Sequence, residues 1–62
     1  MYTEHYGNQI IVRHDNGSVY WSVPVSSNSS HYINGNTLVV EDEDSGRTTI
    51  WDINKRQKIR ST

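Results

Sequence analysis

Three histidines, His5, His14 and His31, are the side chains of this sequence most suited to metal binding or proton transfer. Metal sites need ligands at fixed short spacings, such as a His pair one helical turn apart or a Cys pair. No His pair has such a spacing, and the chain contains no cysteine. The pattern therefore indicates structural or surface roles for all three, and we expect no metal and no cofactor.

A run of four acidic residues, Glu41 to Asp44, is the next candidate. Asp42, Asp44 and Gly46 resemble part of a calcium loop, but the bidentate Glu that closes a twelve-residue loop does not follow. Catalytic carboxylate pairs need an apolar pocket that separates their pKa values, and four acids at a turn do not supply one. We interpret the run as a solvated hairpin tip whose charges discourage edge-to-edge aggregation.

Serine and threonine are plentiful, yet they do not occur in the patterns that activate a hydroxyl group. The sequence contains no GxSxG turn, no SxxK pair and no glycine-rich phosphate loop. We therefore predict a chain that is not an enzyme and that works by binding.

The basic C-terminal segment, residues 55–62, is the clearest binding candidate. Together with exposed aromatic rings it could hold single-stranded nucleic acid, because phosphates meet cations and bases stack on rings. The formal net charge of −1 argues against the strongly basic field of a dedicated nucleic-acid binder. We therefore expect a protein partner first, with a small nucleic-acid-binding β-barrel as the alternative. The predicted binding residues are Tyr20, Tyr32, Arg56, Lys58 and Arg60.

Sugar binding is a further possibility, because aromatic rings stack on pyranoses and Asn, Asp and Ser hold hydroxyl groups. The pattern places Trp21 and Trp51 toward the core, which disfavours this function. An exposed tryptophan would reverse that judgement.

Two similar tryptophan-containing hairpins are predicted to position these residues. In the first, Asn16-Gly17 lies between two β-rich runs, which is the strongest short-range hairpin signal. A two-residue loop there pairs Val12 with Trp21, Ile10 with Val23 and His14 with Val19.

The second hairpin repeats this pattern, with Ser45-Gly46 at its turn. The matching register pairs Val40 with Trp51 and Leu38 with Ile53. A three-residue loop with Gly46 in a bulge would shift this register.

Shorter strands are expected around the two hairpins. Residues 2–6 form an edge strand that turns at Gly7-Asn8, residues 32–33 precede a turn at Asn34-Gly35, and residues 58–60 pair back onto the Trp51 strand. Residues 26–31 are predicted to be a Ser/Asn-rich loop. The fold is therefore an all-β antiparallel meander of about four to six strands, forming a small barrel or sandwich, in a single domain over residues 1–62.

The size of the core raises the question of self-association. The chain has 62 residues, is 32% hydrophobic and has no cysteine to cross-link it, so a monomer is marginal. We therefore expect a homodimer, with Ile11, Tyr20, Tyr32 and Val39 as candidate contact residues. The alternative is that the two apolar faces close on each other within one chain. No segment has the pattern of a signal peptide or a membrane span, and we expect a cytoplasmic location without membrane binding.

The segment from Ser45 to Ile53, followed by Lys55 and Ile59, resembles the final strands of a WD-type propeller repeat. It covers under a third of the chain, the usual upstream Gly-His pair is absent, and the first hairpin has Trp21-Ser22 in place of Trp-Asp. We attribute the resemblance to shared hairpin chemistry. If it implied a function, that function would be a protein-interaction scaffold.

Overall fold

The computed structural model describes residues 1–62 as seven antiparallel strands. It contains no helix that could cross a membrane. The all-β prediction is confirmed, although the chain forms more strands than the four to six expected. The strands are β1 (Tyr2–Tyr6), β2 (Gln9–Arg13), β3 (Val19–Pro24), β4 (Ser29–Asn34), β5 (Thr37–Asp42), β6 (Thr48–Asp52) and β7 (Gln57–Ser61).

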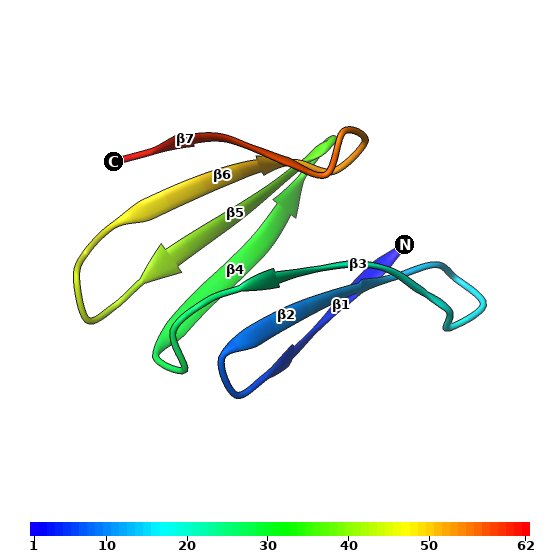
Figure 1. Cartoon of the computed structure of the whole chain (residues 1–62), viewed down its shortest axis with the longest axis horizontal. Coiled ribbons are helices and arrows are strands. Elements are labelled where there is room, and N and C mark those ends of the chain that lie inside the picture. The colour runs from blue at the N-terminus through cyan, green and yellow to red at the C-terminus, as the bar shows by residue number, and fades with distance from the viewer.

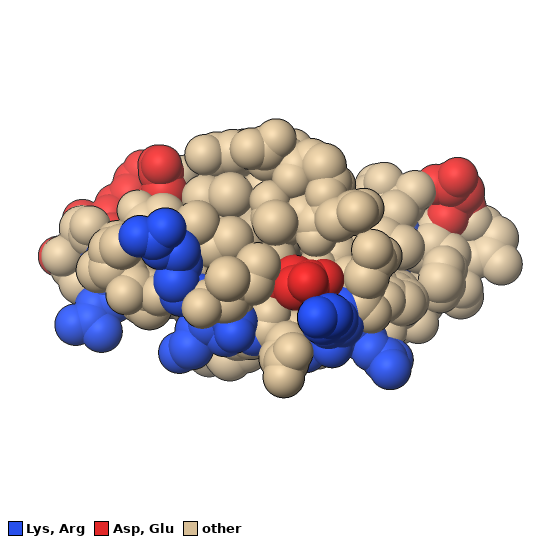
Figure 2. Space-filling model, turned by 90° about the horizontal axis from the view of Figure 1, so that it is seen from above, with Lys and Arg blue, Asp and Glu red and all other residues tan.

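The strands form two separate sheets, which Figure 1 shows as two successive meanders. The first sheet has the order β1-β2-β3 and the second has the order β4-β5-β6-β7. No strand pairing joins them, so the barrel is not closed and the fold is a small two-layer sandwich. The body measures 34 × 23 × 15 Å, and Figure 2 shows it from the side that carries β7.

Two of the predicted cross-strand pairs of the first hairpin are correct, but its turn differs from the prediction. Val12 lies opposite Trp21 and Ile10 lies opposite Val23, as expected. The pairing of His14 with Val19 is wrong, because Arg13 lies opposite Val19. The turn has three residues, and Gly17 takes a φ of +93° in it. The His14 N–H donates to the Ser18 carbonyl, and the Gly17 N–H donates to the His14 carbonyl. A bulge at Tyr20 then restores the pairing of the inner strand residues.

The second hairpin is shifted by two residues from the predicted register. Leu38 lies opposite Trp51 and Val40 lies opposite Thr49, so the predicted pairs of Val40 with Trp51 and Leu38 with Ile53 are wrong. The cause is a four-residue loop between Asp42 and Arg47, in which the Gly46 N–H donates to the Asp42 carbonyl. A shift of two leaves every side chain on its predicted face.

The predicted short strands are confirmed, and the predicted loop is shorter than expected. Strand β1 turns at Gly7-Asn8, strand β4 leads through Gly35 into β5, and β7 pairs with β6. Assigning residues 26–31 to a loop is wrong at its C-terminal end, because β4 begins at Ser29. Ser29 and Ser30 pair with the end of β5, and backbone pairing along that strand outweighs their turn-forming composition.

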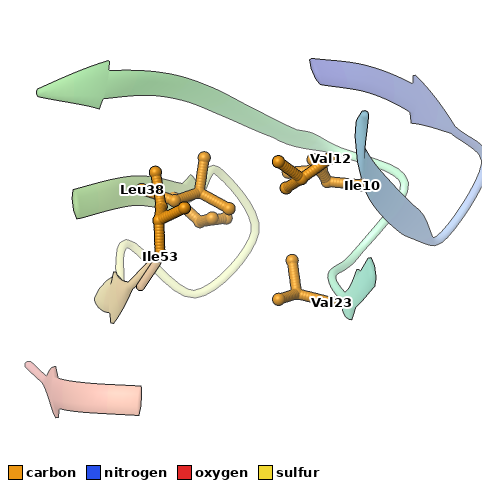
Figure 3. Close-up of a cluster of buried hydrophobic side chains, with 6 residues drawn as sticks. Ile10, Val12, Val23, Leu38 and Ile53 are labelled. Carbon is orange, nitrogen blue, oxygen red and sulfur yellow. The ribbon is translucent and has the colours of Figure 1, made fainter. Parts of the chain in front are cut away.

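Six aliphatic side chains fill the space between the sheets (Figure 3). Three of them come from β2 and β3 of the first sheet. The other three come from β5 and from the residue that follows β6, and the two groups point toward one another. Each is at most 5% exposed, which stabilises the fold by about 1.5–3 kcal/mol per side chain. The six are Ile10, Val12, Val23, Leu38, Val40 and Ile53.

Both tryptophans lie against this core, but neither is buried within it. The Trp21 and Trp51 rings meet edge to face, with centroids 5.5 Å apart and planes at 71°. Such a contact adds about 0.5–1.5 kcal/mol beyond the apolar area that it covers. The indoles therefore close one side of the core, while its centre is aliphatic.

The sandwich brings equivalent residues of the two halves together. Strands β1 to β3 correspond to β4 to β6, with a His-Tyr pair ahead of the first turn in each. His5 meets His31 at 6.0 Å, just as Trp21 meets Trp51. Each apolar face is therefore covered by the other within one chain, which is the alternative considered above.

His31 ties the two sheets together beside the core. Its Nε2 is 2.8 Å from the hydroxyl oxygen of Thr3 on β1. Partial burial lowers the pKa of His31, and the neighbouring His5 lowers it further. The neutral imidazole is therefore the form that the folded protein favours.

We expect truncation of the aliphatic core to destabilise the protein strongly. Leu38→Ala should lower the free energy of unfolding by about 3 kcal/mol, because Leu38 is 0% exposed and a cavity would remain. Ile59→Ala is the matched control and should cost less than about 1 kcal/mol, because Ile59 is 53% exposed. Urea titrations of both variants measure the difference, and equal losses would contradict this assignment of the core.

We also expect the free energy of unfolding to fall as the pH drops below about 6.5, the ordinary pKa of a histidine. The folded state holds the pKa of His31 below its ordinary value of 6.5, so the unfolded chain takes up the proton first as the pH falls. The stabilisation that comes from this lowered pKa is fully present well above pH 6.5 and is lost as the pH falls through the folded-state pKa. His31→Gln should flatten this part of the curve of unfolding midpoint against pH, whereas His14→Gln should leave it in place. A slope unchanged by His31→Gln would contradict the assignment.

Candidate functional site at the β7 edge

Strand β7 has no facing strand in the other sheet. The histidine contact places β1 against β4, and the tryptophan contact places β3 against β6. The second sheet has one strand more than the first, so β7 extends past the sandwich. All five of its residues are exposed, which is true of no other strand. The side chains and one backbone edge of β7 are therefore open to solvent.

The backbone edge of β7 is free to form hydrogen bonds. The Thr62 N–H donates to the Thr48 carbonyl at 2.9 Å, so the backbone of residue 62 points toward β6. Because successive residues of a strand point in opposite directions, the N–H and C=O of Ser61 point to the free edge. The first sheet has the edge strands β1 and β3, and β3 ends in Pro24, which has no N–H to donate.

Two cations flank this edge on opposite faces of the sheet. Lys58 lies opposite Trp51 on the inner face, and Arg60 lies opposite Ile50 on the outer face. Neither forms an ion pair, since the two ion pairs of the chain join Met1 to Asp15 and Arg13 to Glu4. Figure 2 shows Lys and Arg side chains along one margin of this side, with acidic groups at both ends and one acidic group at the centre, next to the basic side chains.

Tyr20 and Arg56 meet at the start of β7, but they serve the fold. The Arg56 guanidinium lies 5.6 Å from the centre of the Tyr20 ring, and the edge-to-face contact with His14 takes another side of that ring. The Tyr20 hydroxyl donates to the Ile53 carbonyl at 2.9 Å. Tyr20 therefore joins the first sheet to the turn before β7.

Arg56 occupies a backbone conformation that normally requires glycine. Its φ is +53°, and it stands fourth in the loop between Asp52 and Gln57. Gly46 takes the same position in the loop between β5 and β6, with a φ of +71°. A non-glycine residue costs about 1–2 kcal/mol there, which the contact with Tyr20 partly offsets.

Tyr32 does not join the other predicted binding residues. It lies on β4 with β5 and β6 between it and β7, next to Val39 on the outer face of the second sheet. Val39 is only 6% exposed, and it is flanked by Tyr32 and Ile50. The exposed part of this apolar row is therefore mainly Tyr32, which is 51% exposed.

An open pocket of about 240 Å³ beside β7 was not foreseen from the sequence. It lies between the end of the first sheet and the inner face of the second sheet. Its lining residues come from both sheets and from the segment between β3 and β4, so they come together only when the two sheets pack. The one available signal was the presence of two large indoles in equivalent positions beside so small an aliphatic core. The residues that give it its chemistry are Val25, Ser26, Asp42, Thr49, Trp51 and Lys58.

No group of three or more His, Asp or Glu side chains is placed to hold a metal ion. Comparisons with protein-family models, with curated proteins and with solved structures find no match to this chain.

We expect glycine to be better tolerated than alanine at position 56. Both substitutions remove the contact with Tyr20, but only Arg56→Gly removes the strain of a positive φ, so it should be the more stable variant by about 1 kcal/mol. Thermal unfolding of the pair measures the difference.

The neighbouring Lys55 supplies the control, because its φ is not positive. There the order should reverse, with Lys55→Gly less stable than Lys55→Ala by about 0.5–1 kcal/mol. The same order at both positions would contradict the strain at Arg56.

Proposed function

We propose that this chain is a non-catalytic protein-binding module in which β7 pairs with an extended segment of a partner protein. The observation that carries the proposal is that β7 is exposed along its whole length, with an unpaired backbone edge. Addition of a strand to such an edge is an established mode of peptide recognition, in which main-chain hydrogen bonds give affinity and alternate side chains give specificity.

The charges on β7 favour an acidic partner. Lys58 and Arg60 lie on opposite faces of the strand, so a partner strand with Asp or Glu on both faces complements them. Exposed ion pairs contribute only about 0–1 kcal/mol each. Most of the affinity therefore comes from backbone hydrogen bonds and from covering Ile59. The same cations repel a second copy of β7, which disfavours edge-to-edge pairing of two copies.

Self-association can take another form, in which the acidic tip at residues 41–44 of one copy contacts β7 of a second. The exposed charges of this tip are well placed for that contact, since Glu41, Glu43 and Asp44 form no ion pair. The apolar faces are already covered within one chain, so this contact would be small. Sedimentation equilibrium at micromolar concentration tests it, and a mass above 7.2 kDa would favour a homodimer over a separate partner.

We expect a peptide with the repeat Val-Val-Glu-Glu, which places Glu on both faces of an extended strand, to bind β7. A peptide with the repeat Val-Val-Lys-Lys should not bind. Backbone amide chemical shifts of the isotope-labelled protein report the contact. The expected result is a set of shift changes concentrated on residues 57–62 with the acidic peptide alone. Equal binding of both peptides, or changes centred on Tyr32, would overturn the proposal.

A matched pair of variants at Ser61 tests the backbone pairing itself. Ser61→Pro removes the outward N–H and leaves the bond between residues 62 and 48 in place, so it should weaken the acidic peptide roughly tenfold. Ser61→Ala keeps the N–H and should bind as the unchanged protein does. Thermal unfolding of both variants shows whether the fold is retained.

Single-stranded nucleic acid is the competing partner. Its test is titration with a labelled oligothymidylate at several salt concentrations, because phosphate contacts weaken steeply as the salt rises. Tight, salt-dependent binding of the oligonucleotide together with no binding of the acidic peptide would replace the proposed function. A cytoplasmic location is part of the proposal, and fractionation of cells expressing the tagged chain tests it.

A further inference from the structure

The pocket beside β7 is small, open and mixed in polarity. Its volume of about 240 Å³ lies below the roughly 300–1,000 Å³ of pockets that enclose drug-sized ligands. It therefore fits a single ring or a single side chain. The pocket shares Lys58 with the strand edge described above, but Ser61, whose backbone lies on that edge, does not line the pocket.

One end of the pocket presents an ionised carboxylate. The Oδ1 of Asp42 accepts hydrogen bonds from the Asp44 N–H at 2.9 Å and from the Ser26 hydroxyl at 3.2 Å. The Asp44 N–H is the main cause that lowers the pKa of Asp42. The other oxygen, Oδ2, accepts no hydrogen bond from the protein. This carboxylate is therefore charged, held in place and able to accept a hydrogen bond from a ligand.

The remaining polar groups differ in sign and type. Lys58 supplies an ammonium group without an ion-pair partner, and Thr49 supplies a hydroxyl group. A ligand that fits this set needs an anionic group for Lys58 and hydroxyl donors for Asp42.

The wall of the pocket is apolar and fixed. Trp51 lines it together with Val25 and Val40, while the edge-to-face contact with Trp21 holds the indole in one orientation. A ring held in this way loses little conformational entropy when a ligand covers it. The sequence placed Trp51 in the core and therefore disfavoured sugar binding. Its place on the wall of an open pocket removes that objection.

We propose that this pocket binds a single sugar ring that carries a carboxylate, the hexuronic acid class. The carboxylate pairs with Lys58, ring hydroxyl groups donate to Asp42, and the C–H face of the ring covers Trp51. An acidic side chain of a protein fits less well, because it can pair with Lys58 but has no hydroxyl group to donate to Asp42. A phosphate group of DNA can likewise pair with Lys58 but brings no hydroxyl donor for Asp42.

Titration with glucuronate against glucose tests this proposal, because the two sugars differ only at C6, which is a carboxylate in glucuronate and a hydroxymethyl group in glucose. In amide and indole chemical shifts, glucuronate should move the Trp51 indole and the amides of residues 42, 49 and 58, with a Kd on the order of 1 mM for so small a ligand. Glucose should bind at least roughly tenfold more weakly. Alanine, which carries both an ammonium and a carboxylate, serves as the comparison for a zwitterionic ligand.

Paired lysine variants identify the anion contact. Lys58→Gln should weaken glucuronate roughly tenfold, while Lys55→Gln, which changes a lysine outside the pocket, should leave its affinity unchanged. Ser61→Pro, which blocks the strand edge, should also leave the affinity for glucuronate unchanged. The strand-pairing proposal and the pocket proposal can therefore be tested independently. The proposal would be overturned by the absence of any chemical-shift change with glucuronate, or by equal changes with glucose. It would also be overturned if alanine bound more strongly than glucuronate, or if Lys58→Gln left the affinity for glucuronate unchanged.

Discussion

The small aliphatic core between two equivalent three-stranded units is the contact on which the rest of the structure depends. It holds only six buried side chains, and no disulfide assists it. At that size, burial alone leaves a thin margin of stability. The sheets are therefore also joined at their margins, by the Thr3–His31 hydrogen bond on one side and by the tryptophan pair and the Tyr20 hydroxyl on the other. The sandwich is closed by these polar and aromatic contacts as much as by its core.

The unequal number of strands in the two sheets explains where the candidate sites lie. Three strands face three strands, and β7 is left over. Its outer edge has no neighbour, which creates the proposed strand-binding edge. Its inner face has no strand above it, which leaves room for the pocket bounded by Lys58 and Trp51. A closed barrel would have removed both features by pairing the edge and covering the face. Both proposed sites therefore arise from the same departure from internal symmetry.

The sequence predicted those features that depend on local pattern. Alternating apolar residues around Asn16-Gly17 determine a hairpin and its inner face, and the same rule held for the second hairpin despite its shifted register. The shift itself was not predictable from Ser45-Gly46, because the Asp42 side chain stabilises a longer loop by accepting backbone N–H groups. The start of β4 was missed because its serines extend through pairing with β5. The pocket was missed because its residues meet only through tertiary packing.

Arg56 shows how the exposed strand is held despite its poor cover. A strand with no buried residue gains little from packing, so its position depends on the turn that precedes it. That turn places Arg56 in a strained conformation, where glycine would be easier to accommodate. Arginine gains a contact with the Tyr20 ring, whose hydroxyl bonds to the same turn. The Tyr20 ring belongs to the first sheet, and the turn leads into β7. The contact between Tyr20 and Arg56 therefore holds β7, which lies outside the core, in a fixed position relative to the core. The strain at Arg56 is then the cost of fixing an open edge in a defined orientation, which a binding strand needs and a purely structural turn does not.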